Sequence, residues 1–388
     1  MKEAIDRALN DAIATGIFPS ADLLVAKGGK VLHSAQYGEA RHHTCFDIAS
    51  LTKPLASATI SMMLVAEKIL RLDDTVYQWL GGARQPIHKQ MTIRHLLNHT
   101  SGLPAWQPFY LNLPISLIGT EAGRELILDE CHNEPVVANP DEKTIYSDIG
   151  YIILGEILDQ VGGAPLDALF AQYVARPLGL IDTFFVRTVG APIRTSSRRT
   201  TTTADKHVPT PKGAKVKERQ KPKEHAHRRF APTEDCPWRE RVIHGEVHDQ
   251  NAYALGGVAG HAGLFSTTAD IHRFICELVD CWHGRSNWLP QNIVRELIQE
   301  TKSKTQQDIY VMGWNRPLMR SSSSGHHFSP NSIGHLAYTG CSIWIDLSHD
   351  FWIILLTNRI HPSSTNQKIK AFRPKIHDLI YQELIAGR

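Results

Sequence analysis

The residues best suited to chemistry begin with Ser50 and Lys53, which form the single S-x-x-K pattern in the chain. They stand where a loop enters an apolar segment of helical spacing, and residues i and i+3 of a helix share one face. The Lys53 amine can therefore reach the Ser50 hydroxyl, and the helix dipole disfavours the ammonium form. This pairing is typical of nucleophilic catalysis. The alternative is that Ser50 only caps the helix.

Two later segments could complete such a site. Tyr146 and Asp148 precede a segment of helical spacing over 149–161, so a phenol and a carboxylate can meet at one loop–helix junction. A phenol acts as a base only when a nearby cation lowers its pKa, and Lys53 would be that cation. Segment 334–340 leads into a predicted strand, where a main-chain N–H can face a developing oxyanion. Taken alone, these segments are equally a buried tyrosine with an aspartate cap and a glycine-bearing turn.

Helices and strands at both ends of the chain must position these residues. Apolar spacing predicts a helix and two strands before Ser50, a helix after it, and two strands with a final helix at the C-terminal end. The middle third has mainly helical spacing. The predicted helices cover 1–17, 92–97, 149–161 and 269–278 and resume at about Pro374, and the predicted strands cover 21–26, 31–37, 342–346 and 351–357.

This order predicts an α/β fold of the α+β type, in which an antiparallel sheet built from both chain ends and flanked by helices carries an inserted, mainly helical domain. We expect a sheet domain of 1–70 and 230–388, a helical domain of 71–186, and a basic, flexible insertion of 187–229. The insertion holds 13 of the 42 Lys and Arg residues but only three of the 39 Asp and Glu residues. The body of the protein is therefore acidic, although the whole chain carries +3.

The basic insertion is interpreted as a solvated surface loop, with binding to nucleic acid or another anionic polymer as the alternative. It contains no aromatic residue that could stack on a base. Any such binding would be non-specific and salt-sensitive, so no specific nucleic-acid partner is expected.

Several classes of protein are disfavoured by what the sequence lacks. Six scattered cysteines without C-x-x-C indicate reduced thiols. No apolar run suggests a membrane span, and the N-terminus has the pattern of an amphipathic helix, not of a secretory signal. We therefore predict a cytoplasmic protein, or a periplasmic one if export information is missing. Phosphate-binding and dinucleotide-binding motifs and G-x-S-x-G do not occur, and we expect no cofactor.

A short histidine-bearing segment offers a competing metal site. His244 and His248 are four residues apart and are followed by Asp249, but the pattern H-x-E-x-H is not H-E-x-x-H and no third ligand is evident. We therefore predict no metal. The segment is better interpreted as a wall of the substrate pocket, with His248 and Asn251 as candidate substrate-binding residues.

Taken together, the three segments resemble the serine beta-lactamase and penicillin-binding-protein superfamily, in which S-x-x-K, a Tyr- or Ser-bearing triplet and a K-T-G-like strand motif form one site. The resemblance is strongest to the class C-like branch, which includes esterases, D-alanyl peptidases and beta-lactamases. It extends over most of the chain, and two segments resemble penicillin-binding-protein-4B-like hydrolases in particular. The similar segments are 46–53, 91–103, 146–155 and 176–180, and for the last group 244–252 and 256–266.

The resemblance implies a role for each residue. Ser50 would be the nucleophile, Lys53 its partner, and Tyr146 the general base that later protonates the leaving group. The backbone N–H groups of Ser50 and Tyr338 would form the oxyanion hole.

Three departures from the family pattern bear on the substrate. Asp148 stands where Asn is frequent, and its charge would keep Lys53 protonated and favour Tyr146 as the base. His335 replaces the Lys of K-T-G, so a permanent cation for a substrate carboxylate becomes a titratable one. Ala337 replaces Gly and adds a methyl group where the substrate passes.

These departures favour a serine hydrolase that cleaves a small-molecule ester or amide. The alternatives are a D-alanyl-D-alanine carboxypeptidase or weak beta-lactamase, and a non-catalytic binding protein on the same fold. The intact Ser50, Lys53 and Tyr146 speak against the last, and the missing signal segment conflicts with a peptidase acting outside the cytoplasm. No membrane partner is expected, and the oligomeric state is left open.

Overall fold

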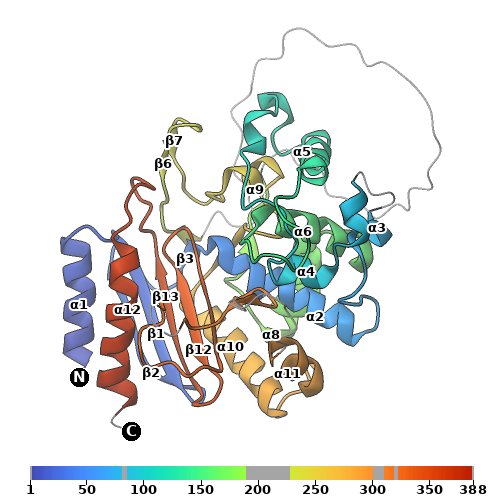
Figure 1. Ribbon diagram of the computed structural model, residues 1–388. Coiled ribbons are helices and arrows are strands. Elements are labelled where there is room, and N and C mark those ends of the chain that lie inside the picture. The colour runs from blue at the N-terminus through green and yellow to red at the C-terminus, as the bar shows by residue number, and fades with distance from the viewer. Residues whose placement is uncertain (1, 81–84, 189–227, 300–309, 319–321, 387–388) are drawn as a thin grey trace.

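The central element of the protein is a seven-stranded antiparallel sheet whose order is β2-β1-β13-β12-β11-β10-β9. The computed structural model describes residues 2–80, 85–188, 228–299, 310–318 and 322–386. One strand from the N-terminal end, β1, pairs directly with β13 from the C-terminal end (Figure 1). This pairing confirms the sheet that was expected from both chain ends. The strands are β1 (Ser20–Lys27), β2 (Lys30–Gly38), β9 (Tyr310–Val311), β10 (Trp314–Asn315), β11 (Ser332–Leu336), β12 (Ser342–Asp346) and β13 (Phe351–Thr357).

Both faces of the sheet are covered. Successive side chains of the inner strands point to opposite faces, and most of them are apolar, so each face packs against a core. Leu23 and Val25 of β1 belong to a core with helices α1 (Lys2–Ala14) and α12 (Ile369–Ile380). Leu24 faces the larger core on the opposite side. Figure 1 shows α1 and α12 side by side over one face, with α10 (Thr268–His283) behind the other.

The C-terminal helix begins earlier than the sequence predicts. Helix α12 starts at Ile369 and contains Pro374, whereas a start at about Pro374 was expected. Ile369 and Arg373 are both buried ahead of the proline. Their packing against the sheet outweighs the backbone hydrogen bond that proline cannot donate.

A mainly helical region connects β3 to β4, as the spacing predicts (Figure 1). Its longest helix, α6, is buried along most of its length and ends at Gly163 in the left-handed conformation. The domain bounds themselves stay a prediction. The α-helices of the region are α2 (Thr59–Ala66), α3 (Val76–Trp79), α4 (Ile93–Leu97), α5 (Glu121–Asn133), α6 (Asp148–Gly162), α7 (Leu166–Phe170) and α8 (Arg176–Leu178).

Further elements lie after the basic insertion and around a small second sheet of order β4-β8-β3-β5. Two residue pairs form a separate hairpin of β6 and β7. The strands are β3 (Thr44–Asp47), β4 (Phe184–Phe185), β5 (Arg229–Phe230), β6 (Asp235–Cys236), β7 (Arg241–Val242) and β8 (Leu264–Ser266), and the helices are α9 (Gln250–Ala254), α10 (Thr268–His283) and α11 (Gln291–Gln299).

Most of the basic insertion lies outside the described residues, which resume at Arg228. Its two ends are held by ion pairs: Arg187 binds Asp167 at 2.7 Å, and Arg228 contacts Asp182.

Residues 49–66 are long and apolar enough to cross a membrane by length and composition alone, but 83% of this stretch is buried inside the protein. Such burial is that of a core helix, so the stretch is weak support for a membrane span.

Candidate active site

Ser50 lies in a short 3-10 turn, Ala49–Leu51, that continues through a π-helical turn into α2. Ala49 has a positive φ of 43°, and the Asp47 carboxylate accepts its N–H at 2.8 Å. The expected helical start after the loop is therefore present, but its first turns are 3-10 and π-helical and not α-helical. It presents Ser50 to a cavity of about 740 Å³.

Lys53 is fully buried and makes three polar contacts with its Nζ atom. It donates to Ser50 Oγ at 3.2 Å and to the carbonyl of His261 at 3.1 Å, and it pairs with Asp148 Oδ1 at 2.7 Å. Burial of an ammonium is costly unless it is paired and hydrogen-bonded, and these contacts meet that need. The S-x-x-K spacing thus brings Lys53 to Ser50 as expected, and Asp148 joins the pair.

The structure corrects the expected state of Tyr146. Its hydroxyl is hydrogen-bonded to Ser50, and Lys53 Nζ lies 4.8 Å from its ring centroid. Lys53 was expected to lower the pKa of the phenol. Burial, with the charge of Asp148 next, instead raises the pKa of Tyr146 well above its ordinary value. The resting side chain is therefore a neutral phenol, which can donate a proton.

The turn between β11 and β12 lies beside the nucleophile. Tyr338 lines the cavity, and its N–H donates to no acceptor within the described part of the chain. Arg359 Nε donates to the Tyr338 carbonyl at 2.8 Å, and Thr339 Oγ1 donates to the carbonyl of Asp47 at 2.8 Å. These bonds fix the turn against the loop that carries Ser50. Ala337 also lines the cavity, as expected.

His335 lines the cavity but is not the titratable cation that the sequence suggested. Burial, with the charge of Lys53 next, lowers its pKa to about 3. Its Nδ1 accepts the Leu336 N–H at 2.8 Å, as a neutral ring can. His335 is therefore neutral at physiological pH. The expectation failed because residue spacing does not reveal that the ring is only 2% exposed.

Only one of the two residues proposed from the segment 244–252 lies in the cavity wall. His248 stacks on Tyr338 with ring centroids 5.6 Å apart and binds Glu234 at 2.9 Å. Asn251 as a substrate-binding residue is wrong: its Nδ2 donates to the carbonyl of Gln107 and its Oδ1 accepts the N–H of Tyr110. Both ends of its amide are thus occupied by a neighbouring loop.

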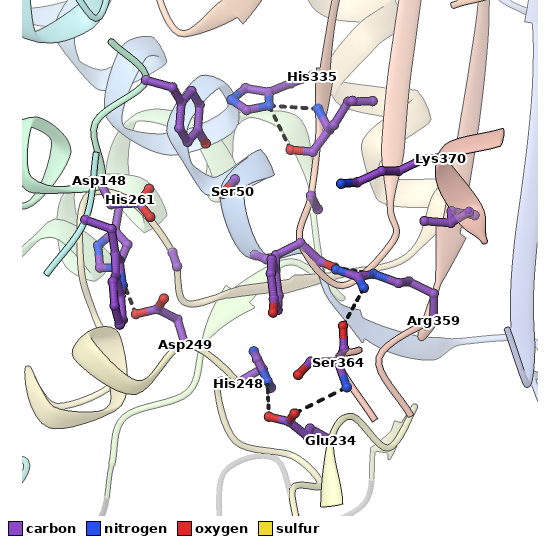
Figure 2. A pocket seen from close by; sticks show the side chains of 18 of the residues that line it. Ser50, Asp148, Glu234, His248, Asp249, His261, His335, Arg359, Ser364 and Lys370 are labelled. Atoms are coloured by element: carbon purple, nitrogen blue, oxygen red, sulfur yellow. Dashed lines mark hydrogen bonds and ion pairs between the residues drawn. The ribbon is translucent and has the colours of Figure 1, made fainter. Parts of the chain in front are cut away.

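The cavity has a cationic side that sequence reasoning missed. Lys370, Arg359 and Arg373 all line it, and Figure 2 shows Lys370 and Arg359 across from Asp148 and Asp249. The two arginines bind backbone carbonyls, whereas the Lys370 side chain makes no hydrogen bond or ion pair with another described residue. The sequence offered no signal, because these residues come from segments far from Ser50.

Comparisons with known proteins agree with this arrangement. The family model described as Beta-lactamase matches residues 5–374. A relative from Escherichia coli (strain K12) named "Putative D-alanyl-D-alanine carboxypeptidase" is 28% identical over 390 residues, covering 94% of this chain and 84% of the relative. The N-acetylmuramyl-L-alanine amidase of Bacillus subtilis (strain 168) is 29% identical over 381 residues, covering 92% of this chain and 80% of the amidase. The solved octameric penicillin-binding protein homologue from Pyrococcus abyssi superposes with a TM-score of 0.69 at 18% identity, covering 100% of this chain and 77% of that one.

Proposed function

We propose that this chain, which belongs to the beta-lactamase family and is a serine hydrolase, cleaves a small ester or amide through an acyl-enzyme on Ser50. One observation carries the proposal. The Ser50 hydroxyl is contacted by both Lys53 and Tyr146, so a nucleophile, a nitrogen base and a phenolic acid meet at one oxygen.

In the acylation step, Ser50 Oγ attacks the substrate carbonyl and its proton passes to the Lys53 amine. The N–H groups of Ser50 and Tyr338 stabilise the oxyanion. Tyr146 gives its proton to the departing alcohol or amine, and the Lys53 ammonium restores that proton. Assigning Lys53 as the base and Tyr146 as the acid agrees with the raised pKa of the phenol.

Deacylation uses the same groups. Water attacks the acyl carbonyl and gives a proton to the Lys53 amine, the bond between the acyl carbon and Ser50 Oγ breaks, and Tyr146 protonates Oγ. The Lys53 ammonium then restores the proton of the phenol, and the free acid leaves. The Asp148 carboxylate holds Lys53 Nζ beside Ser50 through the ion pair at 2.7 Å.

A substrate panel tests the proposal. Purified wild type is assayed with p-nitrophenyl acyl esters, nitrocefin and a peptide ending in D-alanyl-D-alanine. Ser50→Ala and Tyr146→Phe serve as the active-site variants, and Ser116→Ala, on an exposed segment, is the matched control. We expect Ser50-dependent ester hydrolysis. Equal ester turnover by wild type and Ser50→Ala would overturn the assignment.

A D-alanyl-D-alanine carboxypeptidase is the second candidate, and the cationic side of the cavity favours it. The neutral His335 cannot attract a terminal carboxylate, but Lys370 lines the same cavity and can. The guanidinium groups of Arg359 and Arg373 also line it, and neither forms an ion pair with a carboxylate of the described residues. The name of the Escherichia coli relative points in the same direction. Release of D-alanine from the peptide, with the ester cleaved more slowly, would support this candidate.

A further inference from the structure

His99 occupies a backbone position at which glycine is usual. It follows α4, and the N–H groups of His99 and Thr100 bond back to the carbonyls of Leu96 and His95 at 3.4 and 2.9 Å. These two bonds form a Schellman motif, whose residue in the left-handed conformation is most often glycine. His99 has a φ of +59°. A histidine with this φ is conformationally costly, which calls for a reason in its side chain.

His99 holds the backbone on both sides of Tyr146, once through its main-chain carbonyl and once through its ring. The carbonyl of His99 accepts the N–H of Ile145 at 2.8 Å, and its ring Nδ1 accepts the N–H of Ser147 at 3.0 Å. Two bonds from one residue therefore fix the peptide units that flank the phenol.

The ring of His99 also packs on the phenol itself. The centroids of His99 and Tyr146 are 4.4 Å apart with planes tilted by 35°, and Tyr310 meets the His99 ring edge-on at 4.7 Å. The imidazole is 1% exposed, and burial, with the charge of Lys53 next, lowers its pKa well below the ordinary value. A neutral ring keeps Nδ1 as an acceptor, so the bond to Ser147 persists across the working pH range.

We propose that His99 is the positioning residue of the acid–base group: it holds the Tyr146 hydroxyl at Ser50 through the two flanking hydrogen bonds and the stacked ring. His99 does not contact the reacting atoms. The inference rests on the proposed function, because it gives Tyr146 a part in proton transfer. A displacement of about 1 Å in a catalytic group can cost on the order of a hundredfold in rate.

The chain offers a matched control for this idea. Lys68 follows α2 in the same Schellman geometry, with a φ of +61° and with the N–H groups of Lys68 and Ile69 bonded to the carbonyls of Val65 and Leu64. It is exposed and does not line the cavity. Glycine at either position relieves the same backbone conformation, so His99→Gly and Lys68→Gly differ in the side chain that is lost.

The experiment compares the ester hydrolysis of His99→Gly, His99→Asn and Lys68→Gly. His99→Gly should lower kcat by about a hundredfold with KM within twofold, whereas Lys68→Gly should match wild type. His99→Asn should recover part of kcat, because asparagine tolerates the left-handed conformation and its Oδ1 can replace Nδ1 as the acceptor for Ser147. Thermal unfolding of each variant separates loss of fold from loss of positioning.

Tyr146→Phe distinguishes failure of the inference from failure of the proposed function. If the phenyl variant keeps wild-type kcat, the role of Tyr146 is wrong. If it loses activity, adding His99→Gly to it should cost less than threefold more, because His99 acts through the missing hydroxyl. A full further hundredfold loss in the double variant, or wild-type kcat in a folded His99→Gly protein, would overturn the positioning role.

Discussion

At the scale of single residues, the chemistry depends on which groups contact the buried Nζ atom of Lys53. Its Nζ touches the nucleophile, a carbonyl and the Asp148 carboxylate at once. Only the carboxylate can be neutralised without moving the backbone, which makes Asp148 the most informative position beside the nucleophile.

Asp148→Asn should lower kcat for an ester by about tenfold. Without the carboxylate the buried Lys53 Nζ loses one of its three partners and is held less firmly at Ser50 Oγ. The measurement is kcat for the ester, with thermal unfolding to check the fold. Asp73→Asn, an exposed site whose partner is Arg94, is the control. Wild-type kcat in a folded Asp148→Asn protein would contradict this role of the carboxylate.

Lys370→Gln should affect anionic substrates selectively. An exposed ion pair contributes up to about 1 kcal/mol, so KM for a peptide with a free terminal carboxylate should rise about fivefold, while KM for the same peptide amide stays unchanged. Lys375→Gln is the matched control, because Lys375 is exposed on the same helix but does not line the cavity. Equal effects on the acid and the amide would exclude a role in carboxylate binding.

The sequence predicted which residues meet at the site better than it predicted their states. Ser50 and Lys53 are three positions apart, so local helical geometry brings them together. His335 is neutral because the folded chain buries it. The Asn251 amide is hydrogen-bonded to a loop more than 140 positions away in the sequence. Such facts depend on the tertiary fold and leave no local pattern.

At the scale of secondary-structure elements, β1 carries a buried carboxyl group that couples the sheet to α10. Asp22 is 3% exposed and accepts hydrogen bonds from Gln36 and Thr268, each at 3.0 Å. Burial raises its pKa from 3.8 to about 6. Because the folded pKa lies above the unfolded one, stability is fully present below pH 3.8 and is lost as the pH rises through about 6.

Asp22→Asn should remove this loss. The free energy of unfolding of the variant, relative to wild type, should rise by about 2.4 kcal/mol between pH 4 and pH 7. Chemical denaturation at several pH values provides the measurement, and Asp11→Asn on the exposed side of α1 provides the control. A constant difference between variant and wild type across this range would show that Asp22 does not titrate in the folded protein near pH 6.

Most elements of the sheet could be predicted, because alternation and turn residues define β1, β2, β12 and β13 locally. β11 was treated only as a segment leading into a strand, since its glycine and histidine do not form an apolar run. The early start of α12 was missed because a proline normally marks the beginning of a helix, and only packing against the sheet shows otherwise.

At the scale of the whole molecule, charge is divided unevenly between an acidic body and the basic insertion 187–229. The described residues that line the catalytic cavity come from outside that range. Arg187 and Arg228, at its ends, are held by Asp167 and Asp182. The insertion is thus separable in principle from the catalytic body, provided that these two arginines are retained.

Replacement of residues 189–227 by a Gly/Ser linker should leave kcat/KM for the ester within twofold of wild type. It should also lower retention on a heparin column, because the remaining body has a net negative charge. The linker has 39 residues, the same length as the segment that it replaces, so that the spacing between Thr188 and Arg228 is kept. A large loss of kcat/KM in a folded replacement variant would show that the insertion takes part in catalysis.

The measurement that tests the account most directly is covalent labelling of the nucleophile. Wild type is treated with a fluorophosphonate, its intact mass is determined, and the modified peptide is sequenced. We expect one adduct, on Ser50, that is absent in Ser50→Ala and forms more slowly in Tyr146→Phe. An unlabelled folded wild type, or an adduct that persists in Ser50→Ala, would contradict it.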